Sequence, residues 1–295
     1  MMPPANQDVQ NLAREYPEWS SWLAVIDRVI REIEDPAWEA WVPERPEVRH
    51  GPVPLLAGTT VSAEPGKLRR WRQQLVQAAY QSGAPNMSSL KPAQKNNLDS
   101  AVLFESALCE DTPRLRQIAG ELGIEPDAFQ AVTGLLPVPF LHACNRRWTA
   151  ARPPGWTAGY CPTCGAWPAF AEVRGIERDR YLRCGRCGSE WQSHALSCPY
   201  CGNTDHDALA SLLPEKSGAA RAVDTCKRCL GYVKTFTTLQ GSPPARVILD
   251  DLASVDLDLA ALEQGYKHPA GPGYALDTRV AGRPGLGERI FSWHT

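Results

Sequence analysis

Apolar residues in the first half of the chain recur with the period of an α-helix. Between Trp22 and Ile33 they lie at i, i+3, i+4, i+7, i+8 and i+11, with charged residues on the opposite face. Gly83 follows another such stripe, at the position where a glycine usually ends a helix. The periodicity predicts helices over residues 22–33, 68–79, 98–109, 112–122, 126–135 and 139–148. Residues 1–150 are therefore predicted to form a helical bundle.

The pattern changes in the second half. Residues 151–158 are a linker by composition, with two prolines and a glycine. From 159 to 240 the chain consists of short segments in which apolar and polar residues alternate, broken by glycine and proline. Leu196–Gly202 and Tyr232–Leu239 are examples, and their spacing is typical of β-hairpins. The overall prediction is an α+β protein with a helical first half and a β-ribbon second half.

Residues 241–295 are predicted to hold one helix and an extended tail. Gly265 is the predicted helix end, and the tail from His268 is rich in glycine and proline. The predicted buried face of this helix consists of Leu252, Val255, Leu259 and Leu262. In the first half, Thr112 followed by Pro113 is the predicted N-cap of a helix.

Candidate chemistry is concentrated in the ribbon segment, which contains four Cys-x-x-Cys pairs. Each pair holds two thiolates close enough to bind one ion, and two pairs form a tetrahedral all-sulfur site. Eight cysteines therefore predict two closed metal sites. The predicted ligands are Cys161, Cys164, Cys184, Cys187, Cys198, Cys201, Cys226 and Cys229.

Sequential pairing is the simplest arrangement of the four pairs, because it leaves loops of 19 and 24 residues that suit a hairpin with a turn at each end. Joining the second pair to the third would leave a ten-residue loop. Glycine follows the second cysteine in three pairs, where a left-handed φ favours it. In the fourth pair Leu230 takes this place and Gly231 comes one residue later, so this turn is predicted to be a variant.

Several roles for the two sites stay open at this point. Each closed site contributes on the order of 10 kcal/mol to folding, so both could be purely structural. Thiol–disulfide exchange is disfavoured because the βαβ context of a thioredoxin motif is missing. Zinc and iron both accept four sulfurs. His194 and His206 are expected outside the ligand sets, and Cys109 and Cys144 are expected to be buried, inert thiols.

Charge and composition narrow the function classes. The chain has 31 basic and 33 acidic residues, so no global field favours nucleic acid. The run Arg178, Arg180, Arg183 and Arg186 is expected to be a solvated face or a patch for an acidic partner. Neither an export signal nor an apolar stretch long enough to span a membrane is found, so a cytoplasmic protein without membrane insertion is expected. Nucleotide-binding and hydrolase motifs are missing, which predicts a protein that is not an enzyme.

The order of motifs resembles the FdhE family of formate dehydrogenase accessory proteins. The resemblance covers residues 156 to 267 and includes residues other than cysteine. It rests on the segments Trp156–Gly165, Arg180–Trp191, Cys198–Gly202, Asp224–Lys234 and Asp250–Tyr266. It implies two tandem rubredoxin-like or zinc-ribbon modules, which hold two metal ions per chain, iron favoured and zinc the alternative, on the eight cysteines. It also implies a cytoplasmic maturation factor that binds formate dehydrogenase subunits and does not itself catalyse a reaction.

Two other function classes remain as alternatives. A zinc-ribbon protein that binds nucleic acid would have a basic ribbon face with exposed aromatic side chains. A redox-regulated zinc chaperone would lose its metal on mild oxidation. The sequence leaves the oligomeric state open, a homo-oligomer included, and nothing is predicted for the role of residues 276–295.

Overall fold

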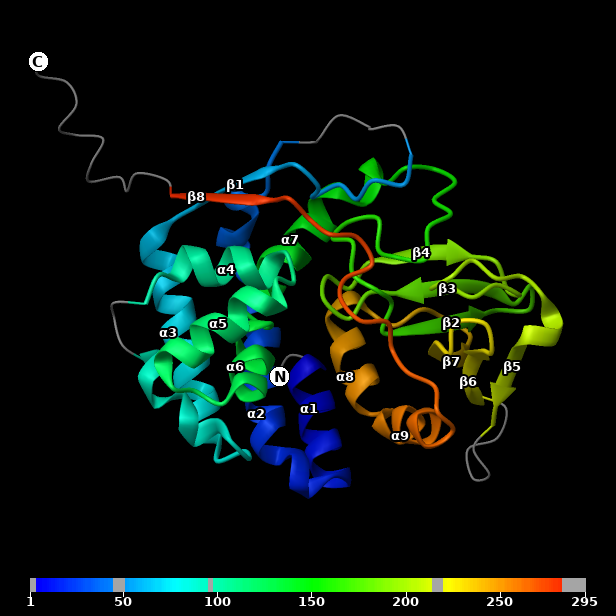
Figure 1. Ribbon diagram of the computed structural model, residues 1–295, viewed down its shortest axis with the longest axis horizontal. Helices are drawn as coiled ribbons and strands as arrows, with labels where there is room; N and C mark the ends of the chain where they lie inside the picture. Colours follow the sequence, from blue (N-terminus) through cyan, green and yellow to red (C-terminus); the bar gives the residue numbers. More distant parts are fainter. Residues whose placement is uncertain (1–3, 45–50, 95–97, 214–219, 283–295) are drawn as a thin grey trace, which may run out of the picture. The chain divides into compact units, whose positions relative to one another are not determined.

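The computed structural model describes residues 4–44, 51–94, 98–213 and 220–282, which divide into two compact units (Figure 1). The first comprises the described parts of residues 4–44, 57–147 and 276–282. The second comprises those of residues 51–56 and 148–275. Helices dominate the first unit and a sheet dominates the second, which confirms the α+β prediction.

The first unit is built of α-helices around an aromatic core. They are α1 Pro4–Glu15, α2 Ser20–Ile33, α3 Pro65–Ser82, α4 Ser100–Leu108, α5 Thr112–Leu122, α6 Pro126–Thr133 and α7 Val138–Trp148. Short 3-10 segments cover Pro17–Trp19, Pro36–Trp41 and Met87–Gln94. The ring centroids of Trp38 and Trp41 lie 4.5 Å apart, and Phe104 lies within 6.3 Å of both. The predicted helices are confirmed, and the stripes of α2 and α3 are buried as expected. In α4 the buried face is instead Leu103, Phe104, Ala107 and Leu108.

Helix ends follow local chemistry, with one correction. Gly83 ends α3 with φ = 72°, as predicted. The N-cap of α5 is Asp111 and not Thr112, because the Asp111 carboxylate accepts the backbone N–H of Arg114 at 3.0 Å. Thr112 is already the first helical residue. Aspartate and threonine are both favoured at the N-cap, so Asp111 and Thr112 were both possible from the sequence alone.

A small parallel sheet in the first unit joins distant segments. Its strands are β1 Thr60–Ala63 and β8 Arg279–Gly282. The Glu105 carboxylate on α4 accepts the backbone N–H of Val280 at 2.7 Å. Part of the tail predicted as extended is therefore a strand that lies with the helical unit, and residues 283–295 lie outside the described part.

The second unit is organised around one six-stranded sheet, in the order β4-β3-β2-β7-β6-β5. Its strands are β2 Phe170–Arg174, β3 Asp179–Arg183, β4 Glu190–Ser193, β5 Leu209–Leu212, β6 Arg221–Cys226 and β7 Tyr232–Thr238. Neighbouring strands are antiparallel except β2 and β7, which are parallel and join two three-stranded ribbons edge to edge. The two predicted ribbon modules are confirmed, but Leu196–Gly202 is a turn rather than a strand.

The predicted C-terminal helix is two short helices, α8 Val247–Leu252 and α9 Val255–Glu263. The Ser254 hydroxyl donates to the carbonyl of Asp250 at 2.9 Å at the break between them. The break rotates α9, so Leu257 and Ala261 pack against Val223 and Tyr232 of the sheet. The predicted buried face is wrong for Leu259 and Leu262, which are more than half exposed.

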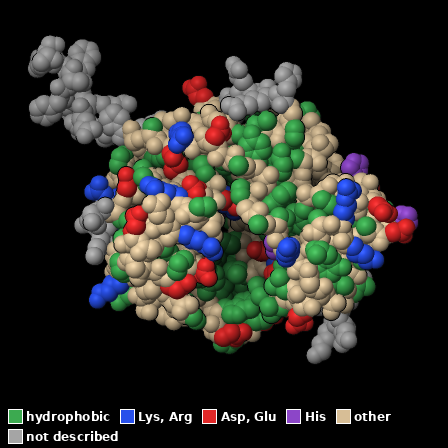
Figure 2. Space-filling model, viewed as in Figure 1, with side chains coloured by type: hydrophobic (Ala, Val, Ile, Leu, Met, Phe, Trp, Pro, Cys, Tyr) green, Lys and Arg blue, Asp and Glu red, His purple; other side chains and the backbone are tan. Residues whose placement is uncertain are grey.

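Two surface properties bear on function. No helix in the described ranges has both the length and the apolar character needed to cross a membrane. Acidic and basic side chains are interspersed on the visible face of each unit (Figure 2).

Candidate metal centres

The structure brings the eight predicted cysteines into two groups of four. Cys161, Cys164, Cys184 and Cys187 form the first cluster, and Cys198, Cys201, Cys226 and Cys229 form the second. All sulfur atoms of a cluster lie within 4.8 Å of one another, and the closest pairs are 3.5 to 3.8 Å apart. Ligands 2.3 Å from a tetrahedral zinc are about 3.8 Å from each other. The donor sets thus fit one tetrahedral metal ion each, in the grouping that sequential pairing predicts.

All four Cys-x-x-Cys turns share one backbone geometry. In each turn the carbonyl of the first cysteine accepts the N–H of the residue after the second cysteine, at 2.8 to 3.0 Å. The N–H of the first cysteine donates to the carbonyl one residue further, at 2.8 to 2.9 Å. The residue after the second cysteine has φ between 57° and 74°. Leu230 adopts φ = 57° like the glycines of the other turns, so the prediction of a variant fourth turn is wrong.

Gly231 is needed for a reason other than its φ. A Cβ at this position would lie 2.6 Å from Cδ2 of Tyr200 and 3.1 Å from Sγ of Cys229. The backbone therefore has to approach the tyrosine ring and the cluster closely. The order Leu230-Gly231 places the glycine where a side chain would clash. The leucine then takes the left-handed backbone conformation, which is unfavourable for a residue with a side chain.

Backbone N–H groups point at the sulfur atoms, as the turns require. Thr163 donates to Sγ of Cys161 at 3.4 Å. In the second cluster the N–H groups of Tyr200 and Cys201 donate to Cys198. Burial raises the pKa of the Cys187 thiol well above its ordinary value, because an isolated thiolate there would lack solvent. A bound metal cation would instead favour the thiolate, because a thiol that coordinates a metal is deprotonated.

The clusters differ in their access to solvent. All four cysteines of the first cluster are buried, none more than 1% exposed. In the second cluster Cys198 and Cys226 are buried, but Cys229 is half-buried and Cys201 is exposed. Reagents that compete for metal or attack thiolates can therefore reach the second cluster more easily.

Buried ion pairs link the strands of the ribbons. Two of them involve Arg180 and Arg183, which were predicted to lie on a solvated face or a patch for an acidic partner. Arg183 is 1% exposed and its Nη1 donates to both oxygens of Glu172, at 3.0 and 2.8 Å. Arg180 is 3% exposed and pairs with Asp224 at 3.3 Å. The prediction of a solvated face is therefore wrong for Arg180 and Arg183, whereas Arg178 is exposed and Arg186 is half-buried. Glu172 lies 11 residues before Arg183 on the neighbouring strand, whereas Asp224 lies 44 residues after Arg180.

Another charged group, which the sequence did not single out, lies behind the second ribbon. Nζ of Lys234 on β7 is 2.8 Å from Oδ2 of Asp258 on α9. The Tyr232 hydroxyl donates to the same carboxylate at 2.9 Å. His268 adds a ring contact to Tyr232, with centroids 4.4 Å apart. These contacts attach α9 to the sheet beside the cluster.

The remaining candidates lie outside the clusters. Neither His194 nor His206 belongs to a four-sulfur group, as expected. Cys144 is buried in α7, as predicted, and its burial raises the pKa of its thiol well above the ordinary value. Cys109 is only partly buried, because it caps α4 at the edge of the helical unit and donates to the carbonyl of Thr278 at 3.4 Å.

Comparison with known proteins adds an independent line of evidence. Residues 196–273, which contain the whole second cluster and α9, match the family model for the C-terminal domain of FdhE. This stretch of the chain is thus similar to the FdhE C-terminal domain. The resemblance inferred from the motif order is thereby confirmed.

Relatives of FdhE also match other parts of the chain. An FdhE homologue of Aquifex aeolicus is 28% identical over 201 residues, 65% of this chain and 64% of that protein. An FdhE homologue of Pseudomonas aeruginosa is 37% identical over 112 residues, 36% of each. The matched segments thus span less than two thirds of either relative. The crystal structure of FdhE from P. aeruginosa shares the fold, with a TM-score of 0.56 and 23% identity over 92% of this chain and 94% of that one.

Proposed function

We propose that the chain is a cytoplasmic accessory protein that binds formate dehydrogenase subunits and is needed for assembly of the active enzyme. The observation that carries the proposal is the FdhE domain match over residues 196–273, which coincides with the second cluster and its supporting helix. The domain boundaries near residues 150, 158 and 240 belong to the same proposal.

The eight cysteines are the proposed ligands of two resident metal ions, with iron favoured because of the rubredoxin-like arrangement and zinc as the alternative. Four sulfurs complete a tetrahedral shell and leave no position for a substrate, which supports a non-catalytic role. An iron ion held in this way could carry one electron, whereas zinc would supply rigidity alone. The residues around each cluster keep the turns closed, and those around the first cluster also limit water access.

The alternative of nucleic-acid binding is less well supported. Two of the four arginines in the basic run are buried in ion pairs, and the visible surface charges are mixed. Such a surface lacks the continuous basic patch that follows a phosphate backbone.

The first test combines metal analysis with complementation. Protein purified without oxygen should contain about two metal ions per chain, and its visible spectrum should distinguish iron from zinc. In a strain that lacks the protein, the wild-type chain should restore formate dehydrogenase activity and co-purify with a subunit of that enzyme. Cys198→Ser should abolish both effects. The matched control is Cys109→Ser, outside the clusters, which should retain them. Full dehydrogenase activity without the protein would refute the proposal.

A further inference from the structure

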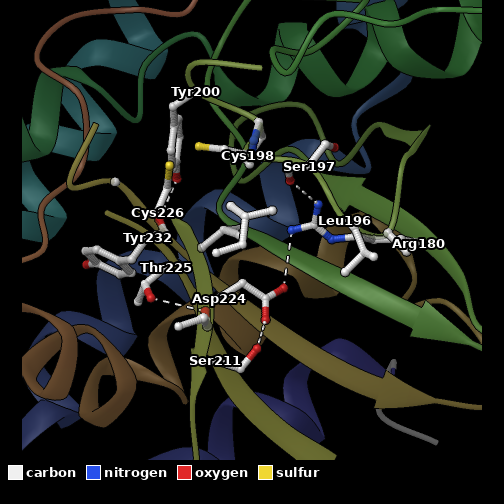
Figure 3. A pocket seen from close by; sticks show the side chains of 16 residues that line it. Arg180, Leu196, Ser197, Cys198, Tyr200, Ser211, Asp224, Thr225, Cys226 and Tyr232 are labelled. Carbon is white, nitrogen blue, oxygen red and sulfur yellow. Dashed lines mark hydrogen bonds and ion pairs between the residues drawn. The ribbon is translucent and has the colours of Figure 1, made fainter. Parts of the chain in front are cut away.

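A cavity of about 260 Å³ lies beside the second cluster, and Cys198 and Cys226 are among the residues that line it (Figure 3). One wall is the loop from Ala195 to Tyr200, and the other is formed by β5, β6 and the start of β7. Side chains alternate along β6, so Val223 faces α9 whereas Asp224 faces the cavity. The cavity therefore opens on the sheet face that α9 leaves uncovered.

The walls of the cavity are mainly apolar, and the rim is exposed. Leu209, Val233 and Pro199 line it together with the Tyr200 ring. Leu196 also lines it and is 68% exposed. Drug-sized ligands occupy pockets of about 300–1,000 Å³, so this volume is better suited to a single side chain.

The polar groups of the cavity are fixed in place and include one unused donor. Nη1 of Arg180 donates to the carbonyl of Ser197 at 3.0 Å, and Nη2 pairs with Asp224. The Ser211 hydroxyl donates to the other oxygen of Asp224 at 2.8 Å. Nε of Arg180 has no hydrogen-bond partner within the described ranges, although the Arg180 side chain is only 2% exposed. A buried donor of this kind is satisfied when a ligand supplies an acceptor oxygen.

Strand β5 gives the cavity an open border. In the described part of the chain β5 pairs only with β6, so its other edge has backbone groups available for pairing. An extended peptide can add to such an edge and place alternate side chains into pockets beside it.

We propose that this cavity receives one large apolar side chain from an extended segment of a partner protein that lies along β5. The inference rests on the proposed function where it names a formate dehydrogenase subunit as that partner. Large apolar side chains buried in pockets contribute most of the affinity at many protein interfaces. Two knuckle turns of the second cluster form the cavity walls, so the docking site is complete only when these turns are closed.

The cavity can be tested without any dehydrogenase. The probe is N-acetyl-leucine methylamide, titrated into the metal-loaded full chain with labelled leucine and valine methyl groups. The methyl resonances of Leu196, Leu209 and Val233 should shift and saturate. Those of Leu239, which is 87% exposed and is not among the cavity residues, should not. No shift at the three cavity residues, or equal shifts at all four, would overturn the proposal.

Docking is tested with two matched variants of exposed residues in the second unit. Leu196→Asp removes an apolar rim residue, whereas Ile176→Asp changes a 94% exposed residue that does not line the cavity. The dissociation constant for the dehydrogenase subunit should rise at least tenfold for Leu196→Asp and less than twofold for Ile176→Asp. Wild-type affinity of Leu196→Asp would overturn the docking site. If the wild-type chain binds no dehydrogenase subunit, the proposed function fails, and the methyl shifts still decide whether the cavity accepts an apolar side chain.

Discussion

Replacing Gly231 by alanine should weaken metal binding at the second cluster and leave the first cluster unchanged. The new Cβ would lie 2.6 Å from the Tyr200 ring, a distance that real contacts do not reach. The ring cannot move away freely, because its hydroxyl donates to the carbonyl of Tyr232 at 2.8 Å and it makes a T-shaped contact with Trp167, with ring centroids 5.2 Å apart. The strain would therefore pass to the turn that carries Cys226 and Cys229.

The size of the effect follows from the cost of overpacking. An extra methyl group in a packed site costs about 1–3 kcal/mol. Because 1.4 kcal/mol corresponds to a factor of ten, the affinity of the second site should fall about 5- to 150-fold. Leu230→Gly is the control at the neighbouring residue. It relieves a left-handed leucine but adds backbone entropy to the unfolded chain, so the two effects nearly cancel.

Competition with a chromophoric chelator under reducing conditions measures both sites in one titration. The fully buried first cluster serves as the internal reference. Gly231→Ala should show one weakened site and one wild-type site, and Leu230→Gly should show two sites within about threefold of wild type. Two wild-type sites in Gly231→Ala would refute the close-packing argument. Equal weakening in Leu230→Gly would show that the leucine side chain, rather than the glycine, sets the turn.

Three further results are expected. A chelator should release the metal beside the exposed Cys201 at least tenfold faster than the one beside the buried Cys164, and equal release rates would contradict control by exposure. Lys234→Met should lower the free energy of unfolding in urea by about 2–4 kcal/mol, because it leaves the carboxylates of Asp251 and Asp258 without their cation. The loss should be somewhat smaller than for fully buried ion pairs, since these carboxylates are 40% and 22% exposed. A loss below about 0.5 kcal/mol would exclude a structural role for the ion pairs. Burial opposes ionisation of Glu172, but the N–H of Ser242 and the Arg183 guanidinium prevail and lower its pKa below 4.5. Its contribution to stability is thus complete above that pH and is lost as the pH falls through the lowered pKa. Urea midpoints of Glu172→Gln should therefore be lower than wild type near pH 7 and approach wild type below pH 4.5, and a constant difference would contradict the assignment.

Much of the second unit could be predicted because its chemistry is local. A Cys-x-x-Cys pair brings two sulfurs together whatever the rest of the fold does, and loop length then favours one pairing. The glycines after three pairs likewise indicated a left-handed residue, and the structure has one at each. The helical stripes of the first unit were equally readable, since burial of one face repeats every turn. The break at Ser254 escaped this reasoning, because apolar residues continue through it and only packing against Val223 shows which face is buried.

Tertiary structure decided the features that depend on distant partners. The sequence predicted two ribbons, but their fusion into one sheet through the parallel pair β2–β7 arises from backbone pairing between segments more than 60 residues apart. The burial of Arg180 and Arg183 depends on Asp224 and Glu172, which local patterns do not connect to them. The difference between a sealed and an accessible cluster has the same origin. Four Cys-x-x-Cys pairs determine that two sites exist, whereas only the surrounding chain determines which sulfur atoms are exposed to solvent.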